Sequence, residues 1–372
     1  MSRLRLAVIG AGHLGRIHAR LAKATDLFQL VGVVDPVDSA RRQAGQELNV
    51  PVYDGHRALY GQIDAAVVAV PTVHHHSVAM DLLRQGVHVL VEKPLAMTGA
   101  EATDIVETAN ERGVVLQVGH IEQFNPALNA ARSLIERPLY IDAVRTSGYT
   151  FRSTDIGVVL DLMIHDLDIV FSLVNSPIRE IRALGVSVMG NHEDMAQVRL
   201  QFENGCVANL TASRASYCSQ RTMQIFGEGI FLGLDFAAPA LRVIRPAPQL
   251  QRRQFDFHNL SVHQREHYKQ HLFDELLPIE DVRLESRNAL LDELKDFGTA
   301  IRTRRAPHVT GQQGWDVITA AEQILAVIAA HAEEVQRNDA FVTADGSVLD
   351  VVRPSVWPAE QEADLGRQRK AG

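Results

Sequence analysis

Short apolar runs alternate with amphipathic stretches over residues 1–120. The apolar runs are rich in β-branched residues, and they predict strands at 4–9, 30–35, 65–70, 87–94 and 114–119. Between them, apolar positions with helical spacing predict helices at 13–24, 76–86 and 99–112. Apolar strands that alternate with helices favour a parallel sheet that is covered on both faces.

The pattern changes after Gly119. An apolar stretch predicts a helix that includes residues 161–174, and it carries Asp161, His165, Asp166 and Asp168. From residue 178 to residue 246, apolar and polar positions alternate between turn signals such as Asn204-Gly205. Neighbouring strands of this kind most simply form an antiparallel sheet.

The last part of the chain reads differently again. Residues 247–285 are polar and His-rich, which is typical of a long segment that extends away from the folded core. Two helices are expected after it, at 286–304 and 313–336. We therefore expect one domain over residues 1–120, a second over 121–345, and a tail over 346–372.

Composition narrows the class of protein. Of the 372 residues, 46% are hydrophobic and the formal net charge is −8, so an acidic surface argues against nucleic acid as a partner. No apolar run reaches the ~20 residues of a membrane span, and the first residues lack the pattern of a signal peptide. Cys206 and Cys218 are too few for a disulfide framework or a cysteine metal cluster. We expect a cytoplasmic protein without a membrane partner.

A glycine-rich turn follows the first predicted strand. Gly10, Gly12 and Gly15 fit the G-x-G-x-x-G pattern, with a strand before them, a helix after them, and Asp35 at the end of the second strand. In this context Gly10 permits the tight turn, Gly12 lets the backbone approach a pyrophosphate, and Gly15 lets helix and strand pack closely. Asp35 would accept hydrogen bonds from ribose hydroxyls and repel a 2′-phosphate, which favours NAD over NADP. The nearby Arg41 and Arg42 weaken that preference slightly.

Two further groups of polar residues are candidates for chemistry. Glu92-Lys93-Pro94 follows a buried strand at the ligand-binding edge of the sheet, where a lysine can point into the cofactor cleft. Asp161, His165 and Asp168 are spaced i, i+4, i+7 and would share one helix face. Asp166 would point elsewhere and pair with an arginine. Asp168 would either support the site or cap a neighbouring segment.

These motifs, in this order and together with Val70-Pro71-Thr72-Val73-His74-His75, resemble the Gfo/Idh/MocA oxidoreductase family over nearly the whole chain. The resemblance implies an α/β protein with an N-terminal Rossmann doubly wound parallel sheet and a C-terminal α/β domain with a large, mostly antiparallel open sheet. It also implies a homodimer or homotetramer through that sheet. The cofactor would be NAD, bound by Gly10, Gly12, His13, Leu14, Gly15, Asp35, Pro71, His75, Glu92 and Lys93. The catalytic residues would be Lys93, Asp161 and His165.

In such an enzyme, a sugar hydroxyl loses hydride to nicotinamide and a proton to a base. Neutral His165 could take that proton while Lys93 stabilises the oxygen, or Lys93 could itself be the base. The segment 118–126 resembles a subgroup that acts on nucleotide sugars such as UDP-N-acetylglucosamine, giving a 3-keto product. His120, Glu122, Gln123 and Asn125, with Lys93, Asp161 and His165, would contact the substrate.

Alternatives remain open from the sequence. Arg145, Arg152, Arg214 and Arg221 would either neutralise a diphosphate or be ordinary arginines on a sheet surface. The substrate could instead be inositol or a free monosaccharide, and the chain could be an NAD-dependent glycosidase or a non-catalytic NAD(H)-binding regulator. His263, His267 and His271 recur every four residues, but we interpret them as part of a solvated or interface helix, and we expect no metal site anywhere in the chain.

Overall fold

The computed structural model of the chain describes residues 2–151 and 156–339. The chain divides into two compact units, Met1–Val327 and Ile328–Gly372, and both sheets belong to the first unit. The tail predicted for 346–372 lies outside the described residues.

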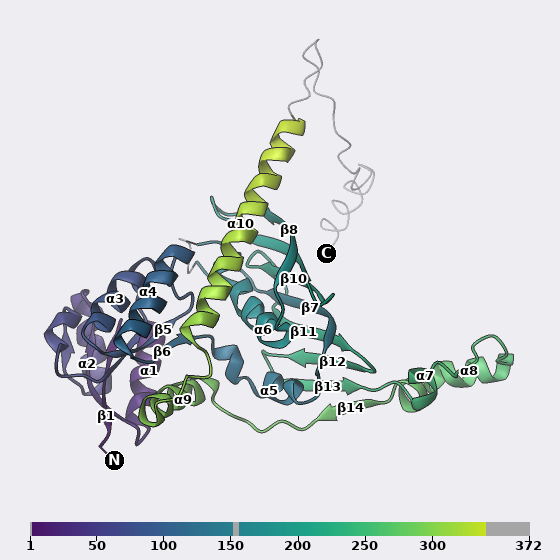
Figure 1. The fold of residues 1–372 in the computed structure, drawn as a ribbon, viewed down its shortest axis with the longest axis horizontal. Helices are drawn as coiled ribbons and strands as arrows, with labels where there is room; N and C mark the ends of the chain where they lie inside the picture. The colour runs from purple at the N-terminus through teal and green to yellow at the C-terminus, as the bar shows by residue number, and fades with distance from the viewer. Residues whose placement is uncertain (1, 152–155, 340–372) are drawn as a thin grey trace, which may run out of the picture. The chain divides into compact units, whose positions relative to one another are not determined.

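The first sheet has six parallel strands in the order β3-β2-β1-β4-β5-β6. Figure 1 labels β1, β5 and β6 of this sheet. Its strands are β1 (Leu4–Ile9), β2 (Phe28–Val34), β3 (Val52–Tyr53), β4 (Ala65–Val68), β5 (His88–Glu92) and β6 (Leu116–Gly119). The helices between them are α1 (His13–Lys23), α2 (Asp38–Leu48), α3 (His75–Arg84) and α4 (Gly99–Arg112). Every residue of β4 is buried, because helices cover both faces. The strand order reverses between β1 and β4, and ligands bind at the carboxyl ends of the strands at such a point.

The second sheet has eight strands in the order β14-β13-β12-β11-β7-β10-β9-β8. Only β7 and β10 pair in parallel among these strands, so the sheet is mostly antiparallel. The strands are β7 (Pro138–Thr146), β8 (Ile178–Val186), β9 (Met195–Phe202), β10 (Val207–Ser213), β11 (Gln220–Gly227), β12 (Ile230–Asp235), β13 (Ala240–Ile244) and β14 (Ile279–Val282). Buried and half-buried positions alternate along β9, so one face is packed and the other is partly open.

Two helices cover the packed face of this sheet. They are α5 (Pro126–Arg132), which packs against β12 and β13, and α6 (Ile164–Val174), which packs against β7. The helix expected to include 161–174 begins differently from the prediction, because Val159–Met163 forms a π turn and only Ile164–Val174 is α-helical. A π turn holds more residues per turn than an α-helix, so it changes the direction of the side chains that it carries.

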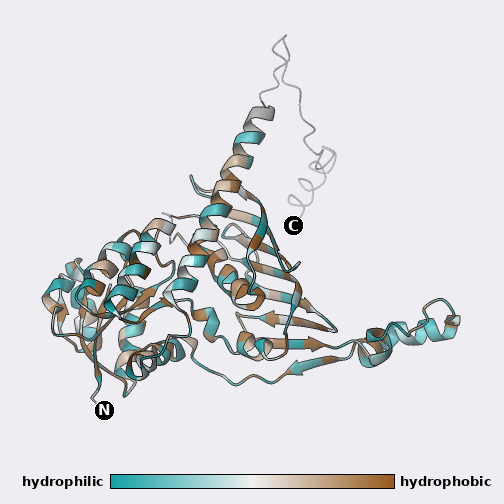
Figure 2. Cartoon of the chain, in the orientation of Figure 1, coloured by the Kyte–Doolittle hydropathy of each residue, from teal (hydrophilic) through white to brown (hydrophobic). Residues whose placement is uncertain are grey.

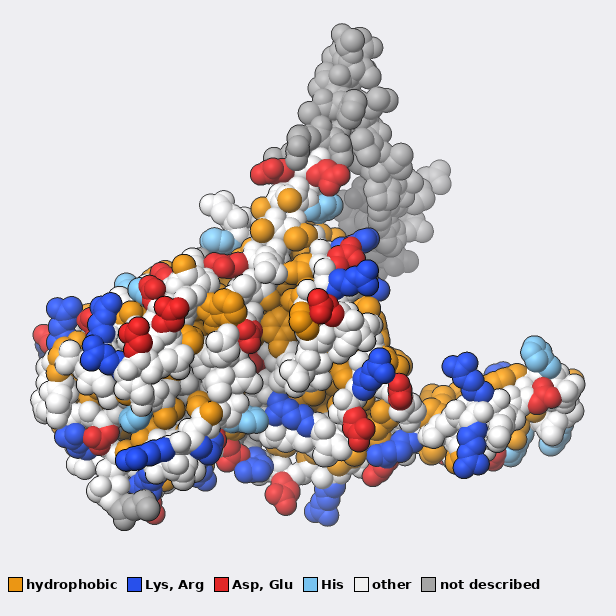
Figure 3. Space-filling view, viewed as in Figure 1, with side chains coloured by type: hydrophobic (Ala, Val, Ile, Leu, Met, Phe, Trp, Pro, Cys, Tyr) orange, Lys and Arg blue, Asp and Glu red, His pale blue; other side chains and the backbone are white. Residues whose placement is uncertain are grey.

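The polar stretch 247–285 forms an exposed arm, which leaves the sheet between β13 and β14. It contains α7 (Pro248–Gln251), α8 (Val262–Gln270) and a π turn (Leu272–Leu276). Figure 2 shows α8 as largely hydrophilic, and Figure 3 shows acidic, basic and histidine side chains interspersed along the arm. Within α8, His267 contacts Glu275 at 2.8 Å and its ring lies 4.7 Å from that of His271.

The last two helices of the described chain are α9 (Ala289–Thr303) and α10 (Gly311–Asp339). Asn288 caps α9, because its side chain accepts a hydrogen bond from the Leu291 N–H. Leu294 and Phe297 of α9 belong to the core of the first sheet, where the Phe297 and Phe28 rings stack 6.4 Å apart. Among the described residues, no helix has both the length and the apolar composition that a membrane crossing requires.

Candidate active site

The glycine-rich turn between β1 and α1 fits a dinucleotide. Gly10 has φ +106°, and a Cβ there would lie 2.3 Å from the Ala69 carbonyl oxygen. A Cβ on Gly15 would lie 1.9 Å from the Gly10 carbonyl oxygen, so only glycine lets α1 pack this closely on the turn. A Cβ on Gly12 would meet nothing within 4 Å, which leaves the backbone open to a phosphate group.

Asp35 lies beside this turn, at the end of β2. Its carboxylate accepts hydrogen bonds from the backbone N–H groups of Ala11 and Val37, both at 2.8 Å. The arginines that could have attracted a 2′-phosphate are already paired, because Arg41 and Arg42 contact the Asp38 carboxylate at 2.9 and 2.7 Å. The arrangement is that of an NAD site rather than an NADP site.

A cavity of about 550 Å³ opens in front of the turn. Gly12, His13 and Leu14 are exposed at one side of it, where the first N–H groups of α1 are available to an anion. The remaining lining comes from the end of β5, from the segments that follow β4 and β5 and from the segment that leads into α6, and it consists of Ala69, Val70, Pro71, Thr72, His75, Glu92, Lys93, Pro94, Ile156 and Asp161. The cavity therefore places the predicted catalytic lysine beside the predicted cofactor turn.

Lys93 and Asp161 form an ion pair across this cavity. The Lys93 Nζ donates to the Asp161 carbonyl oxygen at 2.7 Å and to its Oδ1 at 3.1 Å. Both side chains remain partly exposed, at 20% and 23%. An ammonium group has three N–H donors, so one stays available to a substrate oxygen.

His75 joins the two strand ends that form the cavity wall. Its Nδ1 lies 2.7 Å from the Pro94 carbonyl oxygen, and its Nε2 lies 2.9 Å from the Val70 carbonyl oxygen. Burial lowers the pKa of His75, although the two carbonyl oxygens oppose that effect. The imidazole thus fixes the turn that carries Lys93.

His165 lies in the first turn of α6, close enough to Lys93 for the ammonium charge to act on it. Its side chain is half-buried, and its enclosed Nδ1 has no hydrogen-bond partner among the described residues. Burial, and then the Lys93 charge, lower the pKa of His165 well below its usual value. The imidazole is therefore neutral at physiological pH and can accept a proton.

His120 is enclosed nearby. Neither of its ring nitrogens has a partner among the described residues. Burial, followed by the Lys93 charge, lowers its pKa to about 3. His120 is thus a neutral, enclosed imidazole near Lys93, and its contact with the substrate stays a prediction.

Glu122 and Asn125 lie in a buried polar network behind the site. The Glu122 carboxylate accepts from Arg145 Nη1 at 2.9 Å and from Asn125 Nδ2 at 3.0 Å. Arg145 also pairs with Asp166 at 2.8 Å, which confirms the expected arginine partner of that carboxylate. Burial raises the pKa of Asp166, although the Arg145 charge opposes it.

Gln123 and Asp168 belong to a second buried network, on another side of α6. Gln123 Nε2 donates to the Asp168 carboxylate, and Gln123 Oε1 accepts from Arg132. Burial raises the pKa of Asp168 to about 7, although the hydrogen bond from Gln123 opposes it. Asp168 therefore does not share a polar row with Asp161, and the π turn before α6 accounts for the difference.

The four arginines considered for a diphosphate differ in their surroundings. Arg145 and Arg214 are buried and pair with Asp166 and Asp194. Arg152 lies outside the described residues. Arg221, on β11, is exposed and has no ion pair among the described residues, yet its charge reaches His165.

Some residues of the cavity carry no signal in the sequence. Ile156 comes from the segment that leads into α6, and nothing in its neighbourhood along the chain marks it as a lining residue. His18 does not line the cavity, but its Nε2 lies 2.6 Å from the Glu92 carboxylate, and its position one helical turn after Gly15 was the signal that could have marked it. Both depend on segments that meet only in the folded chain.

The chain matches two family models. Residues 4–120 match the oxidoreductase family with an NAD-binding Rossmann fold, and residues 130–230 match the GFO/IDH/MocA C-terminal domain. Among curated relatives, UDP-N-acetylglucosamine 3-dehydrogenase of Acidithiobacillus ferrooxidans is 33% identical over 89% of this chain and 99% of its own length. The scyllo-inositol 2-dehydrogenase (NAD(+)) of Bacillus subtilis is 31% identical over 62% of this chain and 74% of its own length.

Solved structures agree with these matches. The structure of the Acidithiobacillus ferrooxidans enzyme superposes with a TM-score of 0.78 and covers 89% of this chain and 99% of that one, at 33% identity. Levoglucosan dehydrogenase in complex with NADH superposes with a TM-score of 0.74 over 88% of this chain and 97% of its own, at 16% identity, and so shows the fold alone. With the cofactor turn, the lysine at the strand end and both family domains in place, the chain belongs to the Gfo/Idh/MocA family of NAD-dependent oxidoreductases.

Proposed function

We propose that this enzyme oxidises a ring hydroxyl of a nucleotide sugar, with UDP-N-acetylglucosamine as the substrate and a 3-keto sugar as the product. The observation that carries the chemistry is the Lys93–Asp161 ion pair, which lies in the same cavity as the cofactor turn. The choice of substrate is supported by 33% identity, over 89% of this chain, to an enzyme named for that reaction.

Each catalytic residue has a distinct task in this proposal. Bound NAD supplies the acceptor for hydride. Neutral His165 accepts the hydroxyl proton, and the free N–H of Lys93 donates to the substrate oxygen as negative charge develops on it. Asp161 holds Lys93 in position by accepting from two of its N–H groups. We assign the proton to His165 because the Lys93 ammonium is held by Asp161.

Binding roles follow from the positions of the side chains. The predicted cofactor residues line the cavity or lie beside the turn, as Asp35 does. His120, like Glu122, Gln123 and Asn125, is enclosed and supports the site from behind the cavity lining. Glu122, Gln123 and Asn125 do so through the buried networks. Arg221 pairs with the diphosphate, since it is exposed and its charge already reaches His165.

NADH formation in the presence of candidate substrates tests this function. Purified enzyme and NAD are offered UDP-N-acetylglucosamine, other UDP-sugars, inositol and free hexoses, with a ketone trap to draw off an unfavourable product. Turnover with the UDP-sugar, inhibited by UDP alone, is the expected result. Turnover restricted to free polyols would contradict the choice of substrate, and the similarity to an inositol dehydrogenase makes this the second candidate.

Lys93→Ala tests the catalytic assignment. It should reduce turnover by roughly 10²-fold or more, because the donor to the developing oxyanion is lost, while NAD binding measured by fluorescence is largely retained. The exposed Lys269→Ala in α8 is the matched control and should turn over normally. Undiminished turnover in Lys93→Ala would refute the role of Lys93.

We also propose a homodimer or homotetramer that forms through the partly open face of the second sheet, in the cytoplasm. Large apolar side chains are exposed at or near the edge strand β8, among them Val186, Val188 and Met189. The exposed thiol of Cys218 suits a reducing compartment. Light scattering of the purified protein tests the assembly, and a monomer at micromolar concentration would contradict it.

A further inference from the structure

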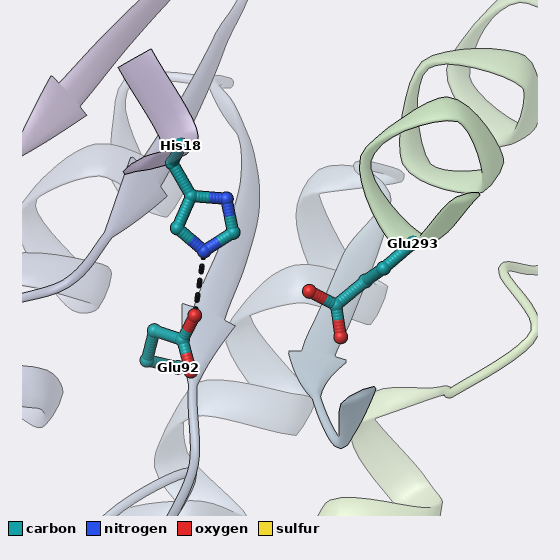
Figure 4. Close-up of side chains that lie close together, drawn as sticks. All are labelled: His18, Glu92 and Glu293. Atoms are coloured by element: carbon teal, nitrogen blue, oxygen red, sulfur yellow. Dashed lines mark hydrogen bonds and ion pairs between the residues drawn. The ribbon is translucent and has the colours of Figure 1, made fainter. Parts of the chain in front are cut away.

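Three side chains that are far apart in the sequence meet behind the cofactor turn. His18 comes from α1, Glu92 from the end of β5, and Glu293 from α9 (Figure 4). One nitrogen or oxygen from each lies within 4.8 Å of the others. His18 Nε2 and Glu92 Oε1 are 2.6 Å apart, and Figure 4 shows the Glu293 carboxylate pointing toward this pair.

The cluster is enclosed and incompletely bonded. The exposures of His18, Glu92 and Glu293 are 0%, 6% and 0%. Among the described residues, neither carboxylate oxygen of Glu293 has a hydrogen-bond partner, nor does His18 Nδ1. A buried carboxylate without a partner is costly, so it indicates a bound group or a proton that completes it.

Charge around Glu293 points the same way. Glu92 and Glu293 place two buried carboxylates beside the single His18 imidazole. Two buried carboxylates that face one imidazole would be neutralised by a divalent cation.

We propose that His18, Glu92 and Glu293 bind a divalent transition-metal ion of the Zn²⁺ or Mn²⁺ type. One imidazole nitrogen and carboxylate oxygens form a donor set that such ions accept. Gln117 helps to fix the backbone that carries Glu293, because its Nε2 donates to the Glu293 carbonyl oxygen at 3.1 Å.

The bonding changes on binding are simple. The His18–Glu92 hydrogen bond is replaced by bonds from both residues to the ion, so the imidazole carries its proton on Nδ1 and Nε2 becomes a ligand. Both carboxylates are ionised in the complex. The ion would be structural, since it joins α9, near the end of the described chain, to the first sheet and its helix α1.

Metal content and thermal stability test the site on the full-length protein. The protein is dialysed against a chelator, titrated with ZnCl₂ and separately with MnCl₂, and analysed for bound metal and melting temperature. We expect one ion per chain at this site, and a melting temperature that rises on loading and falls with chelator. Glu293→Gln should weaken binding by roughly tenfold or more, since it removes one charged ligand.

The exposed histidines of the arm need their own control. His267→Ala removes the centre of the His267–His271–Glu275 group in the arm and should leave the stabilising ion in place. If Glu293→Gln does not fold, His18→Gln serves as the second variant. The proposal would be overturned if the protein bound no stoichiometric metal and its melting temperature did not change. It would also be overturned if His267→Ala lost metal binding while Glu293→Gln kept it. A metal-free Glu293→Gln more stable than the parent would indicate a shared proton instead.

Discussion

At the scale of single residues, the surroundings of a side chain decide its chemistry more than its type does. His165 and His120 both become neutral, because they are enclosed near the Lys93 ammonium. Asp161 and Asp168 have the same side chain, yet one pairs with Lys93 at the cavity and the other is buried against Gln123. Two identical carboxylates on one segment therefore have different roles.

His165→Asn tests the assignment of the proton acceptor. We expect kcat to fall by roughly 10²- to 10⁴-fold with NAD binding retained, because a general base is lost. In the parent enzyme a base with a lowered pKa stays unprotonated as the pH falls, so the acid limb of kcat should lie below the usual histidine range. A rate profile over pH measures this, with His263→Asn as the control. An acid limb at or above neutral pH would contradict the assignment.

Asp168→Asn tests the second buried network. The pKa of Asp168 is about 7 in the folded protein and lies near its ordinary value in the unfolded chain, so the folded state holds a proton that the unfolded state has lost. Between roughly pH 4 and pH 7 the free energy of unfolding should therefore fall as pH rises, by at most about 4 kcal/mol. Asp168→Asn should make this decline shallower in urea titrations but not abolish it, because the buried Asp166 and Glu293 carboxyls also have raised pKa values. The exposed Asp274→Asn should leave the decline unchanged. An unchanged slope in Asp168→Asn would exclude the raised pKa.

At the scale of elements, two short segments position the site. The glycine turn lets α1 begin directly against the end of β1, and the π turn at Val159–Met163 directs Asp161 toward Lys93. His75 lies between the wall segments, and its two ring nitrogens face one carbonyl oxygen of each. Each segment orients backbone or side-chain groups toward the same cavity.

Alanine substitutions at Gly15 and Gly12 distinguish a glycine that is needed for packing from one that is needed for cofactor binding. In Gly15→Ala the new Cβ would collide with the Gly10 carbonyl oxygen, so both the melting temperature and NAD affinity should fall. In Gly12→Ala the Cβ meets no protein atom, so the melting temperature should stay within a few degrees while NAD affinity falls by roughly tenfold or more. Calorimetry with and without NAD measures both quantities. An equal fall in melting temperature in the two variants would contradict this explanation.

At the scale of the molecule, segments that are far apart in the sequence pack into the same core. Helix α9 supplies Leu294 and Phe297 to the core of the first sheet, although more than two hundred residues separate them from Phe28 along the chain. The arm, in contrast, adds no side chain to a core, since none of its residues from 248 to 275 is buried. The free energy of folding is therefore concentrated in the two sheets and their helices.

Limited trypsin digestion tests this distribution. The first cuts should occur in the arm, at exposed sites such as Arg252, Arg253 and Arg265, because cleavage favours exposed chain with few packed contacts. The nicked protein should keep its NAD affinity, and mass spectrometry of the fragments identifies the cuts. Early cleavage within α9 or the first sheet would show that the arm is protected, as it would be if a partner covered it.

The sequence alone determined the local features, because each depends on residues close together in the chain. The alternation of strands and helices, the glycine turn with Asp35, and Lys93 at a strand end all follow from short-range patterns. The boundaries of the two domains stay a prediction. The tertiary structure decided which partners the polar side chains take. It placed Gln123 on Asp168, Arg145 between Glu122 and Asp166, and Glu293 beside His18 and Glu92, since these contacts join segments that only folding brings together.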